Sequence, residues 1–270
     1  MLTKLTNISC LVIYLLMFHS FCNAQEYQPP APVGGDSQLE DFICYEMVYP
    51  EEALKENIKG KVTIRFTVTK DGRTENPVIV SSGSTDLDNE ALRIFRKTLW
   101  NNAVKMGKPV DAQQQIKIKF NPRKYLKSCK KRGFKHFSYD TLNVDTTEKV
   151  YNLSDLEQPP TLDLKDEKNL SSFISKNLKY PEAAFKQNIA GKVRLDYVVE
   201  PHGGVSHIVV KEPLGGGCSQ EAVRIVKLLK YKPGIKDNMA VRTNMTLSLT
   251  FQLHDRQGVQ YVPNTPTSGY

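Results

Sequence analysis

The sequence is poor in the residues on which catalytic and metal sites depend. Its 270 residues include five histidines, five cysteines and one tryptophan. No G-x-S-x-G, H-E-x-x-H or phosphate-loop motif occurs, and no C-x-x-C spacing indicates a redox or zinc site. His202 and His207 flank a turn and could approach each other, but without a third ligand they are more typical of surface residues than of a metal site. We therefore expect no enzymatic activity, no catalytic residues, no metal and no cofactor.

Long hydrophobic runs are also missing, except for one near the N-terminus. That run, Cys10 to Phe18, is far shorter than the about 20 residues that a membrane-spanning helix needs. Lys4 precedes it, and Cys22-Asn23-Ala24 follows with small residues, which is the pattern of a secretory signal peptide. We expect residues 1–24 to be removed on export. An uncleaved anchor is the alternative, and a lipoprotein linked through Cys22 is disfavoured because a bulky residue precedes it.

Few cysteines remain after that cleavage, namely Cys44, Cys129 and Cys218. Export permits disulfides. An odd number leaves at least one thiol unpaired or bridged to another chain, and the spacing does not say which.

Acidic residues are outnumbered, which gives a net charge of +8 and a pI of about 9.1. A mildly basic surface favours anionic partners without naming one, and we do not expect nucleic acid. The longest basic run comprises Arg123, Lys124, Lys127, Lys130, Lys131, Arg132 and Lys135. It could contact lipid phosphates or acidic polymers, but a solvated linker is the simpler interpretation.

The strongest positive feature is an internal repeat with a shift of 131 residues. Tyr49-Pro50-Glu51 aligns with Tyr180-Pro181-Glu182, and Gly60-Lys61-Val62 aligns with Gly191-Lys192-Val193. Between residues 49 and 120 the register needs no gap, and 20 of the 72 positions are identical. One register held over this length indicates two copies of one unit. We predict copy one at 34–122, a linker at 123–164 with a possible added strand near 149–153, copy two at 165–254, and a C-terminal tail at 255–270.

Each unit is predicted to contain, in order, two short helices, two strands, a longer helix and a last strand. Val62, Ile64, Phe66 and Val68 alternate with polar residues, as in a half-buried strand. Asp71-Gly72 is a hairpin signal, and Pro77 suits an edge strand. If the first strand lies between the other two, the sheet is antiparallel and the crossover is right-handed. We therefore expect an α+β fold with two tandem domains, each a three-stranded antiparallel sheet packed by two helices.

The order of these motifs resembles the C-terminal domain of TonB. The resemblance rests on Tyr-Pro-Glu-x-Ala, Gly-Lys-Val with an alternating strand, the turn, and the Glu-Ala helix in both copies. Copy two adds Tyr231-Lys232-Pro233-Gly234, similar to an aromatic-x-Pro-Gly segment of the family, whereas copy one has Trp100-Asn101-Asn102-Ala103. The family motif residues are Tyr49, Pro50, Gly60, Tyr180, Pro181, Gly191, Tyr231, Pro233 and Gly234. We expect Tyr49 and Tyr180 to act mainly as core anchors.

The resemblance implies a periplasmic module, linked to energised transport, that captures an extended peptide of an outer-membrane transporter, the TonB box. Capture would occur by strand addition to an exposed sheet edge. Carried over residue by residue, that edge comprises Gln115, Ile116, Lys117, Ile118 and Lys119 in copy one and Thr246, Leu247, Ser248, Leu249 and Thr250 in copy two. Because copy one lacks Pro-Gly, copy two is expected to be the better site. The alternative is an envelope structural adaptor, or a scaffold that pairs with itself, without a role in transport.

The signal peptide leads to a direct prediction. If cleavage follows Ala24, the intact mass of the exported protein corresponds to a chain that starts at Gln25. A mature chain that retains Met1 contradicts this, and a lipid-modified Cys22 would establish the lipoprotein form instead.

Overall fold

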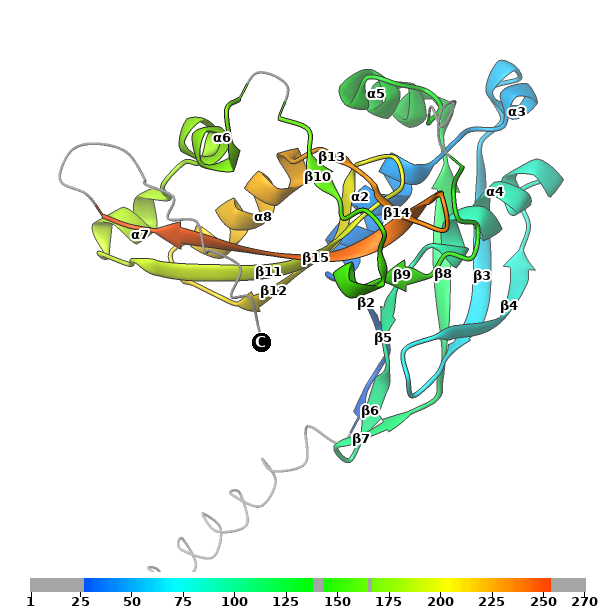
Figure 1. Ribbon diagram of the computed structural model, residues 1–270. Coiled ribbons are helices and arrows are strands. Elements are labelled where there is room, and N and C mark those ends of the chain that lie inside the picture. Colours follow the sequence, from blue (N-terminus) through cyan, green and yellow to red (C-terminus); the bar gives the residue numbers. More distant parts are fainter. Residues whose placement is uncertain (1–26, 138–142, 165–166, 254–270) are drawn as a thin grey trace, which may run out of the picture.

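Two copies of one arrangement of helices and strands make up the computed structural model, which describes residues 27–137, 143–164 and 167–253 (Figure 1). The predicted signal peptide and C-terminal tail lie outside these residues. Copy one contains, in chain order, α2 (Asp36–Glu46), α3 (Glu51–Lys55), β3 (Gly60–Val68), β4 (Thr74–Ser81), α4 (Thr85–Arg96) and β8 (Ala112–Phe120). Copy two contains α6 (Leu170–Asn177), α7 (Glu182–Lys186), β11 (Gly191–Val199), β12 (Val205–Glu212), α8 (Cys218–Leu228) and β15 (Met239–Phe251).

The central sheet of copy one has the order β4-β3-β8, with both pairings antiparallel. β3 pairs with β8 without interruption from Gly60↔Phe120 to Val68↔Ala112. Copy two has the equivalent pairing from Gly191↔Phe251 to Val199↔Thr243. The repeat extends to the irregularities, because both hairpins shift register at equivalent places and have a positive φ at Asn76 (54°) and His207 (49°).

The expected scheme of three strands and two helices per domain is incomplete. The sheet of copy two has five strands, because β14 (Gly234–Lys236) and β9 (Val150–Tyr151) both pair with β15. In each copy, short strands also pair the segment before the first helix with the segment after the long helix. In copy one, β2 (Ala31–Pro32) pairs with β5 (Trp100–Asn101), and β6 (Ala103–Lys105) pairs with both β1 (Tyr27–Gln28) and β7 (Lys108–Val110). In copy two, β10 (Thr161–Leu162) pairs with β13 (Tyr231–Lys232). Strands of two or three residues are too short to produce a periodic signal in the sequence.

The region that we expected to be a linker begins with a helix, α5 (Pro122–Arg132). Asn121 caps it by accepting a hydrogen bond from the Lys124 N–H, and Gly133 ends it in the left-handed conformation. Tyr125 and Cys129 on one face are buried in the core of copy one. A single turn of 3-10 helix, η1 (Leu153–Asp155), follows β9.

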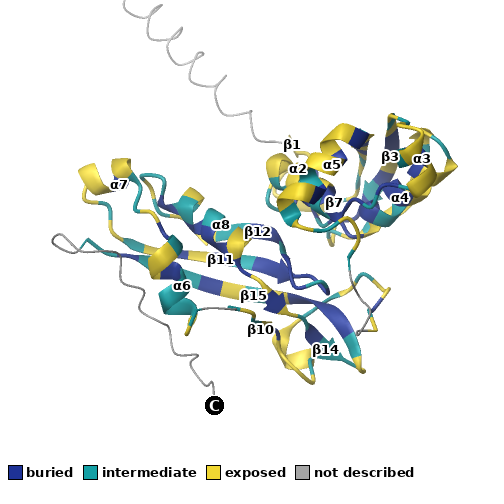
Figure 2. Cartoon of the chain, turned by 90° about the horizontal axis from the view of Figure 1, so that it is seen from above, coloured by how far each residue is buried: buried dark blue, intermediate teal, exposed yellow. Residues whose placement is uncertain are grey.

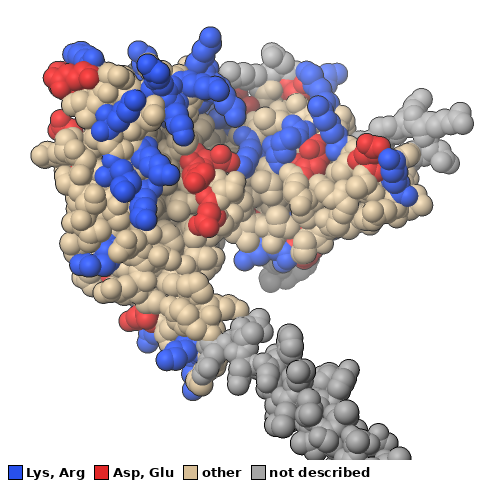
Figure 3. All heavy atoms as spheres, turned by 180° about the vertical axis from the view of Figure 1, so that it is seen from behind, with Lys and Arg blue, Asp and Glu red and all other residues tan. Residues whose placement is uncertain are grey.

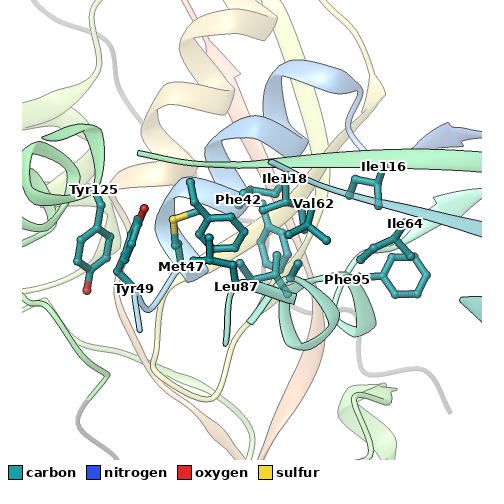
Figure 4. Packing of buried hydrophobic residues seen from close by; sticks show 14 of the residues in the cluster. Phe42, Met47, Tyr49, Val62, Ile64, Leu87, Phe95, Ile116, Ile118 and Tyr125 are labelled. Atoms are coloured by element: carbon teal, nitrogen blue, oxygen red, sulfur yellow. The ribbon is translucent and has the colours of Figure 1, made fainter. Parts of the chain in front are cut away.

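Each copy has its own hydrophobic core between the sheet and its helices. Figure 4 shows Ile64 of β3 beside Phe95 of α4, and Val62 close to Leu87. Figure 2 shows that buried residues in each half lie along the strands and on the helices that cover them. Fully burying one such aliphatic or aromatic side chain stabilises the fold by about 1.5–3 kcal/mol, so each cluster can support a small domain.

The two halves meet where α2 of copy one packs against β12 of copy two. The Gln38 side chain binds both backbone groups of Ile208: Nε2 donates to the carbonyl oxygen at 2.6 Å, and Oε1 accepts from the N–H at 2.9 Å. The ring of Phe42 lies 4.7 Å from the ring of His207. A helix of one copy thereby covers the edge strand of the other.

Beside this contact lies a group of buried charges, the interface charge cluster, formed by Glu46, Lys97, Glu200, His202 and Arg242. Glu46 has no exposed surface, and its carboxylate binds Lys97 Nζ at 3.0 Å and His202 Nε2 at 2.7 Å. Arg242 contacts both oxygens of Glu200 at 2.9 Å and donates to the Lys97 carbonyl oxygen at 3.0 Å. Each carboxylate therefore has a cationic or imidazole partner, and two of the bonds cross between the copies.

Burial and charge act in opposite directions on the acids of this cluster. Burial alone would raise the pKa of Glu46, but hydrogen bonding to His202 and the positive charge of Lys97 lower it well below its ordinary value. Burial likewise opposes ionisation of Glu200, and Arg242 lowers the pKa of that carboxyl. Burial lowers the pKa of the neighbouring His207 from 6.5 to about 4, against the opposing charge of Glu200. At neutral pH both acids are ionised and His207 is neutral.

We predict that the stability of the chain falls as the pH drops from 6.5 towards 4. In this window the His207 imidazole is protonated in the unfolded chain, but in the folded chain it stays neutral until the pH reaches about 4. The contribution of neutral His207 to the free energy of unfolding is therefore fully present above pH 6.5, and roughly 2 kcal/mol of it is lost by pH 5. His207→Asn should flatten this dependence, because Asn76 has the same backbone conformation in copy one. Urea unfolding of both proteins at pH 7 and pH 5 tests this, and equal pH dependence in the two would contradict it.

The separate cores predict that fragments 25–137 and 140–270 each unfold cooperatively. The copy-two fragment should be the less stable, because it loses the Gln38 contact to β12 and leaves His202 without Glu46. Urea unfolding followed by circular dichroism measures both, and adding the first fragment should stabilise the second. If neither fragment folds alone, the two cores are not independent.

Candidate functional site

The last strand of copy one, β8, is an edge strand of its central sheet, and the last strand of copy two, β15, has one side without a partner strand over its second half among the described residues. β8 pairs along its whole length with β3, and within the part of the chain that the structure describes its other side carries no strand. β15 pairs along residues 243–251 with β11. These are the two strands that carry the predicted peptide-binding residues. Their open sides present backbone N–H and C=O groups, the groups that an added strand would bind.

Hydrogen bonds at the start of β15 identify which backbone groups point outward. The N–H of Ala240 donates to the Asn143 carbonyl oxygen at 2.6 Å, and its C=O accepts from the Asp145 N–H at 3.0 Å. Successive residues of a strand alternate in direction. Because the pairing with β11 has no interruption, the other even-numbered residues point outward as well: Asn244, Thr246, Ser248 and Thr250.

The hairpin on the opposite side of each sheet supports the same alternation. The Glu200 N–H donates to the Gly204 carbonyl oxygen, so even-numbered residues of β11 face β12 and odd-numbered ones face β15. Thr69 makes the equivalent bond to Arg73 in copy one. The outward groups of β8 therefore belong to Gln113, Gln115, Lys117 and Lys119.

The predicted site residues thus separate into two sets. Gln115, Lys117, Lys119, Thr246, Ser248 and Thr250 direct backbone groups outward. Ile116, Ile118, Leu247 and Leu249 direct theirs to the neighbouring strand, and their side chains are buried in the cores. The second set supports the edge, and the first set alone can bind a ligand through the backbone.

Part of the β15 edge is already occupied by the segment between the copies. β9 pairs in parallel with Arg242 and Thr243, and Val144 forms a parallel bridge with Ala240. The Asn244 side chain also donates to Asn152 Oδ1 at 3.2 Å, so among the described residues the open edge of copy two begins after Asn244. The sequence predicted a strand near 149–153 but gave no indication of its partner.

The aromatic residues of the Tyr-Pro motif are structural. The Tyr49 hydroxyl donates to the Ile58 carbonyl oxygen, and the Tyr180 hydroxyl donates to that of Ile189, both at 2.5 Å. Pro50 and Pro181 directly precede α3 and α7. Tyr49 also packs at 5.7 Å from the ring of Phe120 at the end of β8. This motif anchors the end of each edge strand to the helices.

Comparison with known proteins agrees with this arrangement. The family model described as Gram-negative bacterial TonB protein C-terminal matches residues 45–122 and again residues 176–253. The chain belongs to the TonB C-terminal domain family. A search of curated proteins found no match.

TonB C-terminal domains are envelope-associated binding or transducer modules, and their usual partners are outer-membrane transporters. The present chain contains two of them in tandem. Within residues 27–137, 143–164 and 167–253, no helix has both the length and the apolar character needed to cross a membrane.

The TonB-like Pro-Gly segment of copy two is held by close contacts. A Cβ on Gly234 would lie 2.6 Å from Thr243 Oγ1, which explains the glycine. Copy one has Ala103 at the equivalent position, and Ala112 aligns with Thr243, so the hydroxyl that crowds Gly234 has no counterpart there. The loss of Pro-Gly in copy one is therefore compensated in the fold, and the open edge of β8 retains its geometry.

The two histidines of the turn do not face each other as potential metal ligands. His202 bonds to Glu46, and His207 bonds to Ser206. No group of three or more potential metal-binding side chains occurs among the described residues. Cys44, Cys129 and Cys218 are free thiols, and burial raises the pKa of Cys44 and Cys218.

Sequence reasoning missed the interface charge cluster, although a signal was present. The members of the cluster are not repeated in the other copy: Glu46, Glu200 and Arg242 align with Asn177, Thr69 and Asp111. A charged residue that is absent from the other copy cannot serve the shared fold. Such positions are candidates for contacts between copies.

Proposed function

We propose that this protein is an exported peptide-binding module of the TonB type, which captures an extended segment of an outer-membrane transporter by strand addition. Its membership of the family supports the class of partner. The proposal rests on the side of β15 that carries no strand among the described residues after Asn244, where Thr246, Ser248 and Thr250 point backbone groups outward at regular spacing.

The chain itself provides an example of such binding. β9 adds in parallel to the same side of β15, directly before the open edge. An incoming strand would continue the ladder that β9 begins. The edge of copy one has no such neighbour among the described residues, and it carries Lys117 and Lys119 in place of Ser248 and Thr250. This difference favours copy two as the site for an uncharged extended peptide.

We predict that Ser248→Pro weakens binding of a TonB-box-like peptide at least tenfold while the protein remains folded. Proline removes the outward N–H, and its ring obstructs the next strand. Thr246→Pro and Thr250→Pro should act in the same way. Calorimetric titration measures the affinity, and circular dichroism checks the fold.

Two controls make the result specific. Ser248→Ala keeps the N–H and should bind as the wild type does. Leu247→Pro removes a hydrogen bond to β11 and should destabilise the domain. The proposal fails if all folded proline variants at even positions bind normally, and its assignment to copy two fails if Lys117→Pro alone removes binding.

Self-association is the second candidate, because β4 is an edge strand of the copy-one sheet and no other described strand pairs with its outer side. Val78 and Val80 on it are 49% and 43% exposed. Pro77 opposes pairing there, since it has no N–H to donate. Analytical ultracentrifugation separates the two functions: a monomer that binds the peptide supports capture, whereas a dimer disrupted by Val78→Lys and indifferent to the peptide supports a scaffold.

A further inference from the structure

The helix α5 follows β8 directly and concentrates positive charge. Its eleven residues contain six cations and no acid. Removing these six charges would lower the net charge of the chain from +8 to +2. Most of the surplus charge of the protein is therefore in this one helix.

Five of these cations form an exposed surface, the α5 cationic face, which consists of Arg123, Lys124, Lys127, Lys130 and Lys131. All five are exposed, and none forms an ion pair with a described residue. Figure 3 shows Lys and Arg side chains gathered at the top of the copy-one half, where α5 lies in Figure 1. The sixth, Arg132, donates hydrogen bonds to the carbonyl oxygens of Met47 and Lys135 and belongs to the fold.

Folding does not explain this face. Lys127 has Arg123 and Lys131 four residues away and Lys124 and Lys130 three residues away, and like charges at these spacings repel on a helix. Arg123 and Lys124 also lie in the first turn, where the helix dipole disfavours cations. An anionic partner would relieve both effects.

The shape and composition of the face favour a membrane over a folded acidic protein. Tyr125 and Cys129 fix the opposite side of α5 in the core, so the five cations project from its exposed side. Leu126 lies among them and is 45% exposed. A basic helix face with an exposed leucine can lie flat on anionic lipid, with the side chain inserted between headgroups.

We propose that the α5 cationic face binds the phosphate headgroups of an anionic membrane surface. This binding is separate from peptide capture, because it involves neither sheet edge. It would hold copy one against a bilayer while leaving the β15 edge of copy two available.

The test measures partition of the full mature chain onto vesicles of phosphatidylcholine with and without phosphatidylglycerol. The triple variant Lys127→Gln, Lys130→Gln, Lys131→Gln should reduce binding to the anionic vesicles by about 100-fold. A matched control, Lys168→Gln, Lys192→Gln, Lys232→Gln, removes the same charge from exposed lysines of copy two and should bind like the wild type. Circular dichroism confirms that both variants fold.

A second variant separates a membrane from an acidic protein. Leu126→Asn should weaken binding to anionic vesicles and leave binding to polyglutamate unchanged. The proposal is overturned if the wild type does not prefer anionic vesicles, or if the two triple variants bind alike. It is also overturned if the α5 variant loses polyglutamate but binds vesicles as the control does, since the face would then serve an acidic protein.

Discussion

The backbone groups at the edges of a sheet must be paired, blocked or left to water, and this constraint organises the chain. Four edges arise from two central sheets. Gln38 binds both backbone groups of Ile208 at the β12 edge, and Pro77 removes a donor from the β4 edge. On the other side, β9 occupies the start of the β15 edge, and no other strand in the part of the chain that the structure describes pairs with the rest of it. The sites proposed for peptide capture are the stretches of β8 and β15 that carry no further strand among the described residues.

Covering β12 requires the two copies to differ, and the interface charge cluster is the clearest sign of that difference. Glu46 of copy one is buried against His202 of copy two, and Arg242 of copy two reaches the backbone of Lys97. Buried ion pairs contribute little net stability, but removing one partner is costly because the other charge remains buried. The cluster therefore specifies how the copies dock more than it strengthens the fold. It also makes the docking sensitive to acid, through His207 and its neighbours.

The two copies also differ in the surfaces that they present. Copy one supplies α2 to cover its neighbour and α5 as a cationic face, whereas copy two retains an edge lined by small hydroxyl side chains. In the capture proposed for β15 the ligand would bind through its backbone, so the side chains on the edge can vary while the geometry persists. The compensation of Gly234 and Thr243 by Ala103 and Ala112 is an example of such variation within one chain.

The repeat, the order of the main helices and strands, and the family could all be predicted from the sequence. These depend on local periodicity and on motifs such as Tyr-Pro and Gly-Lys-Val, whose spacing survives in both copies. The sequence also located the edge strands, but it could not say which of their N–H groups face outward, because that depends on pairing with β11 and β3. Three features could not be predicted in this way: the partner of β9, the helix α5 in place of a linker, and the docking of α2 on β12. Each of these joins residues far apart in the chain, as Glu46 and His202 are, and such contacts leave no periodic pattern in the sequence.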